Sequence, residues 1–122
     1  MISITSIIPH TTIITPSDTS RNALVAAPSS GTAYKINMIS VSNIDGTNPY
    51  NATVELRLAD GSTYRAIAST ISIPANSSLT IMDKSVSFYL LDTSVSGEAS
   101  TIWVTSSTAS KLTFTVSYEA IS

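Results

Sequence analysis

Apolar and hydroxyl-bearing residues alternate along most of this chain, one position at a time. The stretches 51–58 and 111–118 show the pattern most clearly, because every second residue in each of them is apolar. Successive side chains of a β-strand point to opposite faces of a sheet, so a period of two residues predicts half-buried strands. Since this pattern covers nearly the whole chain, the sequence predicts an all-β protein.

The positions of the predicted strands indicate one sandwich. Strands are expected at 22–27, 34–43, 52–59, 62–68, 87–91, 101–106 and 111–121, and residues 71–81 contain a strand end, a polar kink and a further strand. With no helix longer than a turn, these seven or eight strands predict a single antiparallel β-sandwich of jelly-roll or immunoglobulin-like type. A chain of 122 residues is long enough to form one core as one domain.

Three local features refine this expectation. The alternation changes phase inside 34–43, which predicts a β-bulge near Met38 and Ile39, or a strand that passes from one sheet to the other. Asp60-Gly61 predicts a hairpin with a type I′ turn. Strands 101–106 and 111–121 are expected to pair with each other. The predicted core comprises Val54, Leu56, Leu58, Ile102, Val104, Leu112, Phe114 and Val116.

The N-terminal segment, residues 1–21, is expected to be an arm or an edge strand, with the sandwich domain at 22–122. Pro9 and Pro16 interrupt its alternation, and proline is tolerated at a sheet edge because it lacks the ladder donor. An arm would leave the sandwich and lie on a neighbouring subunit. The segment is too apolar for a free tail. The interface residues predicted within it are Ile4, Ile7, Ile8, Ile13 and Ile14. No secretory signal is expected, since the segment has no positive leading region.

The surface is unusually poor in charge. Only 11% of the residues are charged, against about 25% in an average domain, while Ser and Thr make up 40 of the 122 residues. Without a basic stripe, nucleic-acid binding is not expected. No apolar run is long enough to span a membrane. Three lysines give little protection to exposed sheet edges, so we expect partners to cover them.

Residues that could carry chemistry are few. His10 is the only histidine, and nothing in its position suggests a nucleophile or an orienting group. The eight acidic residues are scattered singly, and Asp45, Asp60 and Asp92 fall in predicted loops. A calcium site built from loop oxygens stays open, although no regular spacing of aspartates supports it. The sequence therefore predicts no catalytic residue, no cofactor and no metal site, and a protein that is not an enzyme.

Trp103 is the remaining candidate. It alternates with Ile102 and Val104, so it points to the opposite face of its strand. Three interpretations stay open: Trp103 closes one end of the core, anchors an interface, or joins tyrosines in a sugar-stacking platform. The tyrosines that could contribute are Tyr34, Tyr50, Tyr64, Tyr89 and Tyr118.

Residues 33–121 resemble small all-β virion proteins of tailed bacteriophages, including those of cyanobacterial hosts. The resemblance is carried by Ile73-Pro-Ala-Asn-Ser-Ser-Leu79 and by the closing Thr115-Val-Ser-Tyr-Glu-Ala-Ile121. It implies a location in the virion and a structural role, as a capsid decoration (cement) protein or as a neck or tail component. The implied partners are other virion proteins, such as the major capsid protein. We also expect a homo-oligomer, with a trimer favoured because shells offer local three-fold axes. A carbohydrate-binding module, free or on a fibre, is the alternative.

Overall fold

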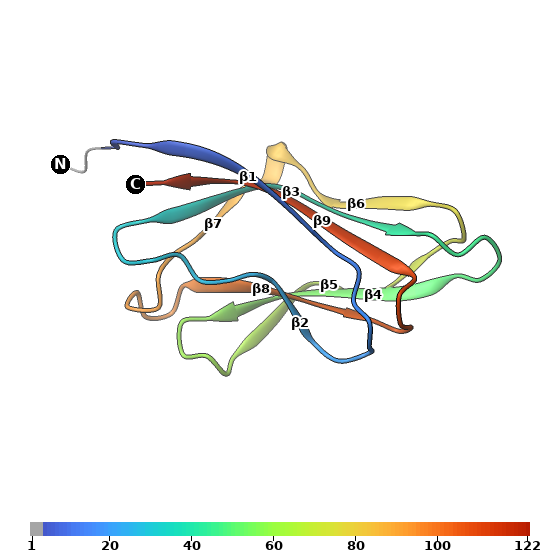
Figure 1. Cartoon of the computed structure of the whole chain (residues 1–122). Helices are drawn as coiled ribbons and strands as arrows, with labels where there is room; N and C mark the ends of the chain where they lie inside the picture. Colours follow the sequence, from blue (N-terminus) through green and yellow to red (C-terminus); the bar gives the residue numbers. More distant parts are fainter. Residues whose placement is uncertain (1–3) are drawn as a thin grey trace.

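Two antiparallel sheets pack face to face in the computed structural model, which describes residues 4–122 (Figure 1). Residues 1–3 of the N-terminal segment lie outside the described part. The elements, in chain order, are β1 (Ile7–Ile14), β2 (Asn22–Val25), β3 (Ala33–Asn43), β4 (Tyr50–Leu58), β5 (Tyr64–Ile73), β6 (Ser78–Met82), the 3₁₀ turn η1 (Lys84–Val86), β7 (Phe88–Leu90), β8 (Ala99–Ser106) and β9 (Leu112–Ile121). The predicted all-β antiparallel sandwich is confirmed.

The strand order is that of a jelly roll. One sheet runs β1-β9-β3-β6, with β7 also paired to β3, and the other runs β2-β8-β4-β5. Partners are therefore nested along the chain: β1 pairs with β9, β2 with β8, β3 with β6 and β7, and β4 with β5. This nesting of early strands with late ones, split over two sheets, distinguishes a jelly roll from an immunoglobulin-like sandwich.

The period of two builds the core as expected. In β9 the side chains of Leu112, Phe114 and Val116 are fully buried, whereas the threonines between them are not. Val54, Ile102 and Val104 are likewise fully buried, and Leu56 packs half-buried against the core. The prediction that Leu58 belongs to the core is wrong. Leu58 lies outside the core cluster because it is the last residue of β4, where the register against β8 shifts.

The phase change predicted in β3 is a real bulge. The register between β3 and β9 shifts between Ile36 and Met38, and a second shift against β6 follows Ile39. The extra residue turns the strand, so Ile36, Ile39 and Val41 all reach the core although their spacing is irregular. β3 stays within one sheet over its whole length, so the alternative prediction of a strand that passes from one sheet to the other is wrong.

Two expectations about neighbouring strands are wrong in part. β8 and β9 do not pair, because β8 lies between β2 and β4 in the other sheet and the chain crosses between sheets over 107–111. The hairpin at Asp60-Gly61 is present, but only Gly61 has a positive φ, of 75°. A type I′ turn needs positive φ at both central residues. The turn is therefore a longer one, closed by the hydrogen bond from the Leu58 amide to the Thr63 carbonyl.

Replacing Phe114 with alanine tests the core assignment. The ring is fully buried at the centre of the sandwich, so the Phe114→Ala change should lower the free energy of unfolding by about 3–5 kcal/mol. Urea denaturation of the two proteins measures this difference. Ile44→Ala, at a side chain that is 60% exposed, serves as the control and should change stability little. Equal effects of the two substitutions would contradict the assignment.

Candidate interaction surfaces

β1 is the edge strand of its sheet, and within residues 4–122 it pairs with β9 alone. Ser6 and Ser122, next to the paired segment, exchange both backbone hydrogen bonds, at 2.9 and 3.0 Å. The register from Ile7 to Ile14 has no shift, so every even-numbered residue of β1 likewise directs its amide and carbonyl toward β9. Odd-numbered residues direct theirs toward the open edge. The nitrogen of Pro9 therefore faces the open edge, where its missing hydrogen costs β1 nothing.

This placement of Pro9 also protects the edge. A second strand that docked on β1 would meet a row of outward donors with a gap at its centre, which disfavours edge-to-edge pairing. Contacts made by this segment with another molecule would then involve side chains more than backbone. The side chains available for such contacts are the isoleucines.

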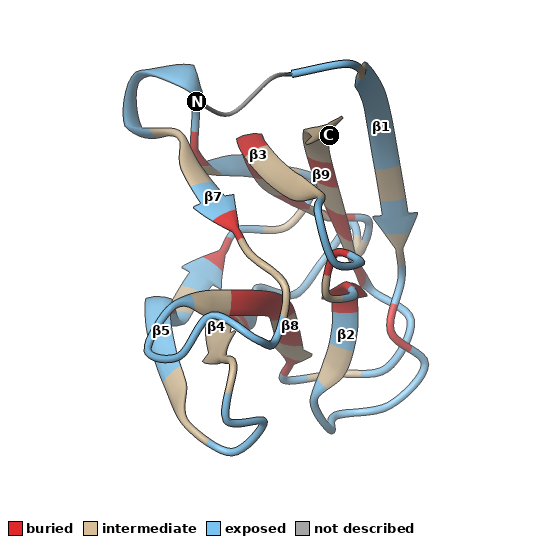
Figure 2. Cartoon of the chain, turned by 90° about the vertical axis from the view of Figure 1, so that its left-hand side faces the viewer, coloured by how far each residue is buried: buried red, intermediate tan, exposed pale blue. Residues whose placement is uncertain are grey.

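Four isoleucines of the N-terminal segment are exposed. The exposed fractions are 61% for Ile4, 56% for Ile7, 52% for Ile8 and 62% for Ile13. Figure 2 shows β1 as a largely exposed strand beside the buried positions of β9. Ile14 differs, because it is opposite Phe114 and packs against the core. The predicted interface set thus divides into an exposed group of four and one residue that attaches β1 to the sandwich.

His10 has a packing role in this arrangement. Its ring stacks on Tyr118, its partner in the ladder, with the ring centres 5.1 Å apart and the planes 19° apart. Tyr118 in turn contacts Tyr34, at 4.9 Å between ring centres. Burial, with a smaller effect of Tyr118, raises the pKa of Tyr34 above its ordinary value. The three rings connect β1, β9 and β3 at one end of the sandwich.

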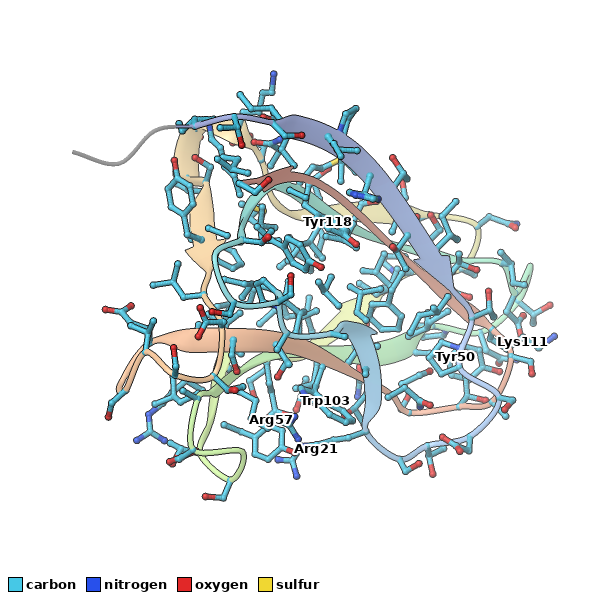
Figure 3. The ribbon with its side chains drawn as sticks, turned by 60° about the vertical axis from the view of Figure 1, so that its left-hand side comes forward. Arg21, Tyr50, Arg57, Trp103, Lys111 and Tyr118 are labelled. Atoms are coloured by element: carbon cyan, nitrogen blue, oxygen red, sulfur yellow. The ribbon has the colours of Figure 1, made fainter. Side chains whose placement is uncertain are left out.

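Trp103 lies on the outer face of the other sheet, in contact with side chains from β4, from β5 and from its own strand β8. The ring of Tyr64 meets it edge-on, with the ring centres 6.2 Å apart, and the guanidinium of Arg57 lies 4.8 Å from its ring centre. Its indole nitrogen donates a 3.0 Å hydrogen bond to the hydroxyl of Thr101. Figure 3 shows Arg21, Arg57 and Trp103 together on this side of the molecule. Trp103 is therefore not an end cap of the core.

The aromatic residues do not form a sugar-stacking platform. Arg21 covers the ring of Tyr64 at 3.9 Å, as Arg57 covers that of Trp103, so each ring has one face occupied. Tyr50 donates its hydroxyl to the carboxylate of Asp45, at 3.0 Å, and Tyr89 is exposed on β7 of the opposite sheet. The six aromatic side chains named in the sequence are thus divided among separate places.

All five aspartates of the chain serve turns. Each stands two residues before a serine or threonine whose backbone amide donates to its carboxylate: Asp18 with Ser20, Asp45 with Thr47, Asp60 with Ser62, Asp83 with Ser85 and Asp92 with Ser94. These hydrogen bonds favour the ionised form, and the pKa of every one of the five is lowered. The repeated Asp-x-Ser/Thr pattern in the sequence was the available signal for these turns.

Other ligand sites are sparse in the described chain. Within residues 4–122 no group of three or more histidine and acidic side chains lies close enough to hold a metal ion. No helix in the same part is long and apolar enough to cross a membrane. The outer face of the β1-containing sheet carries an open hollow of about 730 Å³ beside η1. Its lining residues are Thr11, Asn37, Met38, Asp83, Lys84, Ser85 and Ser117.

Comparisons with known proteins add little. No family model and no curated protein matches the chain. Partial similarity is found to solved structures of infectious bursal disease virus: T=1 particles (14% identity, TM-score 0.39), the Gx strain (13%, 0.36) and the VP2 subviral particle (16%, 0.36). These matches cover 93% of this chain but only 31%, 37% and 32% of those chains. At such TM-scores the similarity establishes no family, and the surfaces are interpreted from their own chemistry.

The aspartate turns predict a loss of stability in acid. Hydrogen bonds from the Thr63 hydroxyl and from the Ser62 and Thr63 amides lower the pKa of Asp60 from 3.8 to about 2. A pKa that is lower in the folded state contributes stability above the unfolded value, and this contribution disappears as the pH falls from about 4 to about 2. Asp60→Asn keeps an acceptor in the turn but should make the melting temperature depend less steeply on pH in this range. Ser96→Ala, at an exposed loop residue that does not titrate, is the control and should keep the wild-type slope.

Proposed function

We propose that this protein is a structural component of a bacteriophage virion and acts as a capsid decoration or cement protein that binds neighbouring shell subunits. The observation that carries the proposal is the row of exposed isoleucines on and before β1, within a segment that contains no lysine, arginine, aspartate or glutamate between residues 4 and 16. Exposed apolar side chains along a sheet edge are suited to a partner protein.

The energetics of burial support this role. Covering an isoleucine side chain that was fully exposed stabilises a complex by roughly 1.5–3 kcal/mol. The four isoleucines are a little over half exposed, so their burial against a shell contributes part of that for each one. Many copies binding to one shell would multiply the effect. A decoration protein needs surface area for contacts and no catalytic residues. The sparse charge and hydroxyl-rich surface of this chain are consistent with such a role.

Further support comes from the resemblance of residues 33–121 to small virion proteins of tailed bacteriophages, and from the jelly-roll topology, which is common among capsid proteins and lectins. Topology alone does not assign a function. The same isoleucine row would serve a neck or tail component, which is the alternative location. A carbohydrate-binding module is less consistent with the surfaces, because arginines cover ring faces that a sugar would use.

The proposal includes a homo-oligomer. A trimer suits a shell, because local three-fold axes place three equivalent surfaces close together. In this arrangement the N-terminal segment reaches a neighbouring subunit through the side chains of the isoleucine row, while Ile14 keeps β1 attached to its own sandwich. Sedimentation of the purified protein measures the oligomeric state.

Omitting the protein from assembling particles should lower the melting temperature of the shell. A ligand that binds only the assembled state stabilises it by mass action, so adding purified protein back should restore the melting temperature in a dose-dependent way. Calorimetry of particles with and without the protein measures both effects. An unchanged shell, with the protein found only at the neck or tail, would favour the alternative location.

The isoleucine row is tested by Ile7→Thr combined with Ile13→Thr. Both side chains lie on the outer face of an edge strand, and threonine retains the β-branched shape that strands favour, so the fold and its melting temperature should change little. Binding to particles that lack the protein should fall by an order of magnitude or more, since ~1.4 kcal/mol corresponds to tenfold. The control is Ile44→Thr, which is equally exposed but lies in the loop between β3 and β4. Undiminished binding of the double variant would exclude the row from the interface.

A further inference from the structure

Arginine is distributed unevenly in this protein. The chain has three arginines and one tryptophan, and all four belong to the β2-β8-β4-β5 sheet or its immediate flank. Arg21 directly precedes β2, Arg57 lies in β4 and Arg65 in β5, while Trp103 lies in β8. The whole chain has a net charge of −2, so this sheet is locally positive against an acidic background.

The charges on the outer face of this sheet do not balance. Glu55 accepts two hydrogen bonds from Arg21, at 2.9 and 3.2 Å, which neutralises that pair. Arg57, beside it in the same strand, has no carboxylate partner within residues 4–122. Its Nε is enclosed and forms no hydrogen bond within the same residues. One guanidinium without a carboxylate partner therefore remains on this face, because Glu55 is already engaged by Arg21.

Arg57 is nevertheless held in place. Its guanidinium rests on the ring of Trp103, and that ring is fixed by the hydrogen bond to Thr101 and by the edge of Tyr64. An arginine that is already ordered loses little side-chain entropy when it binds a partner. Its planar group donates two parallel hydrogen bonds to a carboxylate, which a lysine cannot do.

We propose that Arg21, Arg57, Tyr64 and Trp103 form a docking face, here called the Arg/Trp face, for an acidic segment of another protein. The inference rests on the proposed function, in which that protein is a subunit of the shell. A polypeptide is favoured over an anionic glycan because arginines already cover the aromatic rings that a sugar would stack on. Trp, Tyr and Arg are also the residue types enriched at binding hot spots between proteins. The partner's carboxylates form the ion pair with Arg57 that no carboxylate of residues 4–122 provides.

The single tryptophan provides the measurement. Because Trp103 is part of the Arg/Trp face, its fluorescence and the NMR signal of its indole N–H report binding there without any label. The probe is a short poly-L-glutamate peptide, with a poly-glutamine peptide of the same length as the neutral comparison. The glutamate peptide should shift the indole signal in a saturable way, and the response should weaken as salt is raised. The glutamine peptide should have no effect.

Variants locate the contact. Arg57→Gln should weaken peptide binding by about tenfold, as expected for a hot-spot residue, and Arg57→Lys should recover only part of the loss. The matched control is Arg65→Gln, which removes the same charge from the same sheet. Arg65 is opposite Leu56 in the ladder, so its side chain leaves from the other face. Thermal melting of each variant verifies that the fold is retained, and Arg21→Gln provides a second variant if Arg57→Gln does not fold.

Several results would overturn the inference. An equal loss in the Arg65 variant would mean attraction by net charge alone. Stronger binding of a sulfated oligosaccharide than of the peptide would indicate a glycan site. Self-association that disappears in Arg57→Gln would identify a second copy of the chain as the occupant.

Sedimentation with particles that lack the protein separates the two proposals. If wild type and Arg57→Gln bind particles equally, the Arg/Trp face is not the contact, although the virion role stands. If neither binds particles but the glutamate peptide still shifts Trp103, the acidic-segment inference survives and the virion role fails. Weakened particle binding of Arg57→Gln, with normal binding of Arg65→Gln, supports both.

Discussion

The sandwich depends on the position of its last strand. β9 lies between β1 and β3 and pairs with both along its length, and it places Leu112, Phe114 and Val116 at the centre of the core. Until β9 arrives, β1 has no partner in its sheet and β3 lacks one of its two sides. Joining the first strand to the last closes a loop of nearly the whole chain, so the native pairing is both entropically costly and highly specific.

The surface shows how a protein with few charges keeps its loops ordered. Five aspartates and their following serines or threonines close turns by short local hydrogen bonds, with no ion pair between strands needed at those places. Arg21 and Glu55 form the ion pair found in the described chain. Arg57 has no carboxylate partner within residues 4–122.

The two candidate surfaces differ in their physical character. The isoleucine row is apolar and belongs to an edge strand, whose open side is interrupted at Pro9. The Arg/Trp face is cationic and aromatic, and it lies on the opposite sheet. One surface would contribute mainly through the hydrophobic effect and the other through oriented hydrogen bonds. Because they lie on different sheets, one copy could contact two neighbours at once, which the proposed cementing role requires.

The sequence by itself determined which side chains face inward, because that depends only on the period along each strand. It located the β3 bulge and seven of the eight expected core residues, and it placed Trp103 on the strand face opposite to Ile102 and Val104. The partner of each strand was decided by the tertiary structure: alternation specifies a face and carries no information about the neighbour, so β8 and β9 were expected to pair and do not. The Arg/Trp face could not be predicted either, because alternation does not say which strands are neighbours. Its members come from positions 21, 57, 64 and 103, and they meet only when β2, β8, β4 and β5 lie side by side.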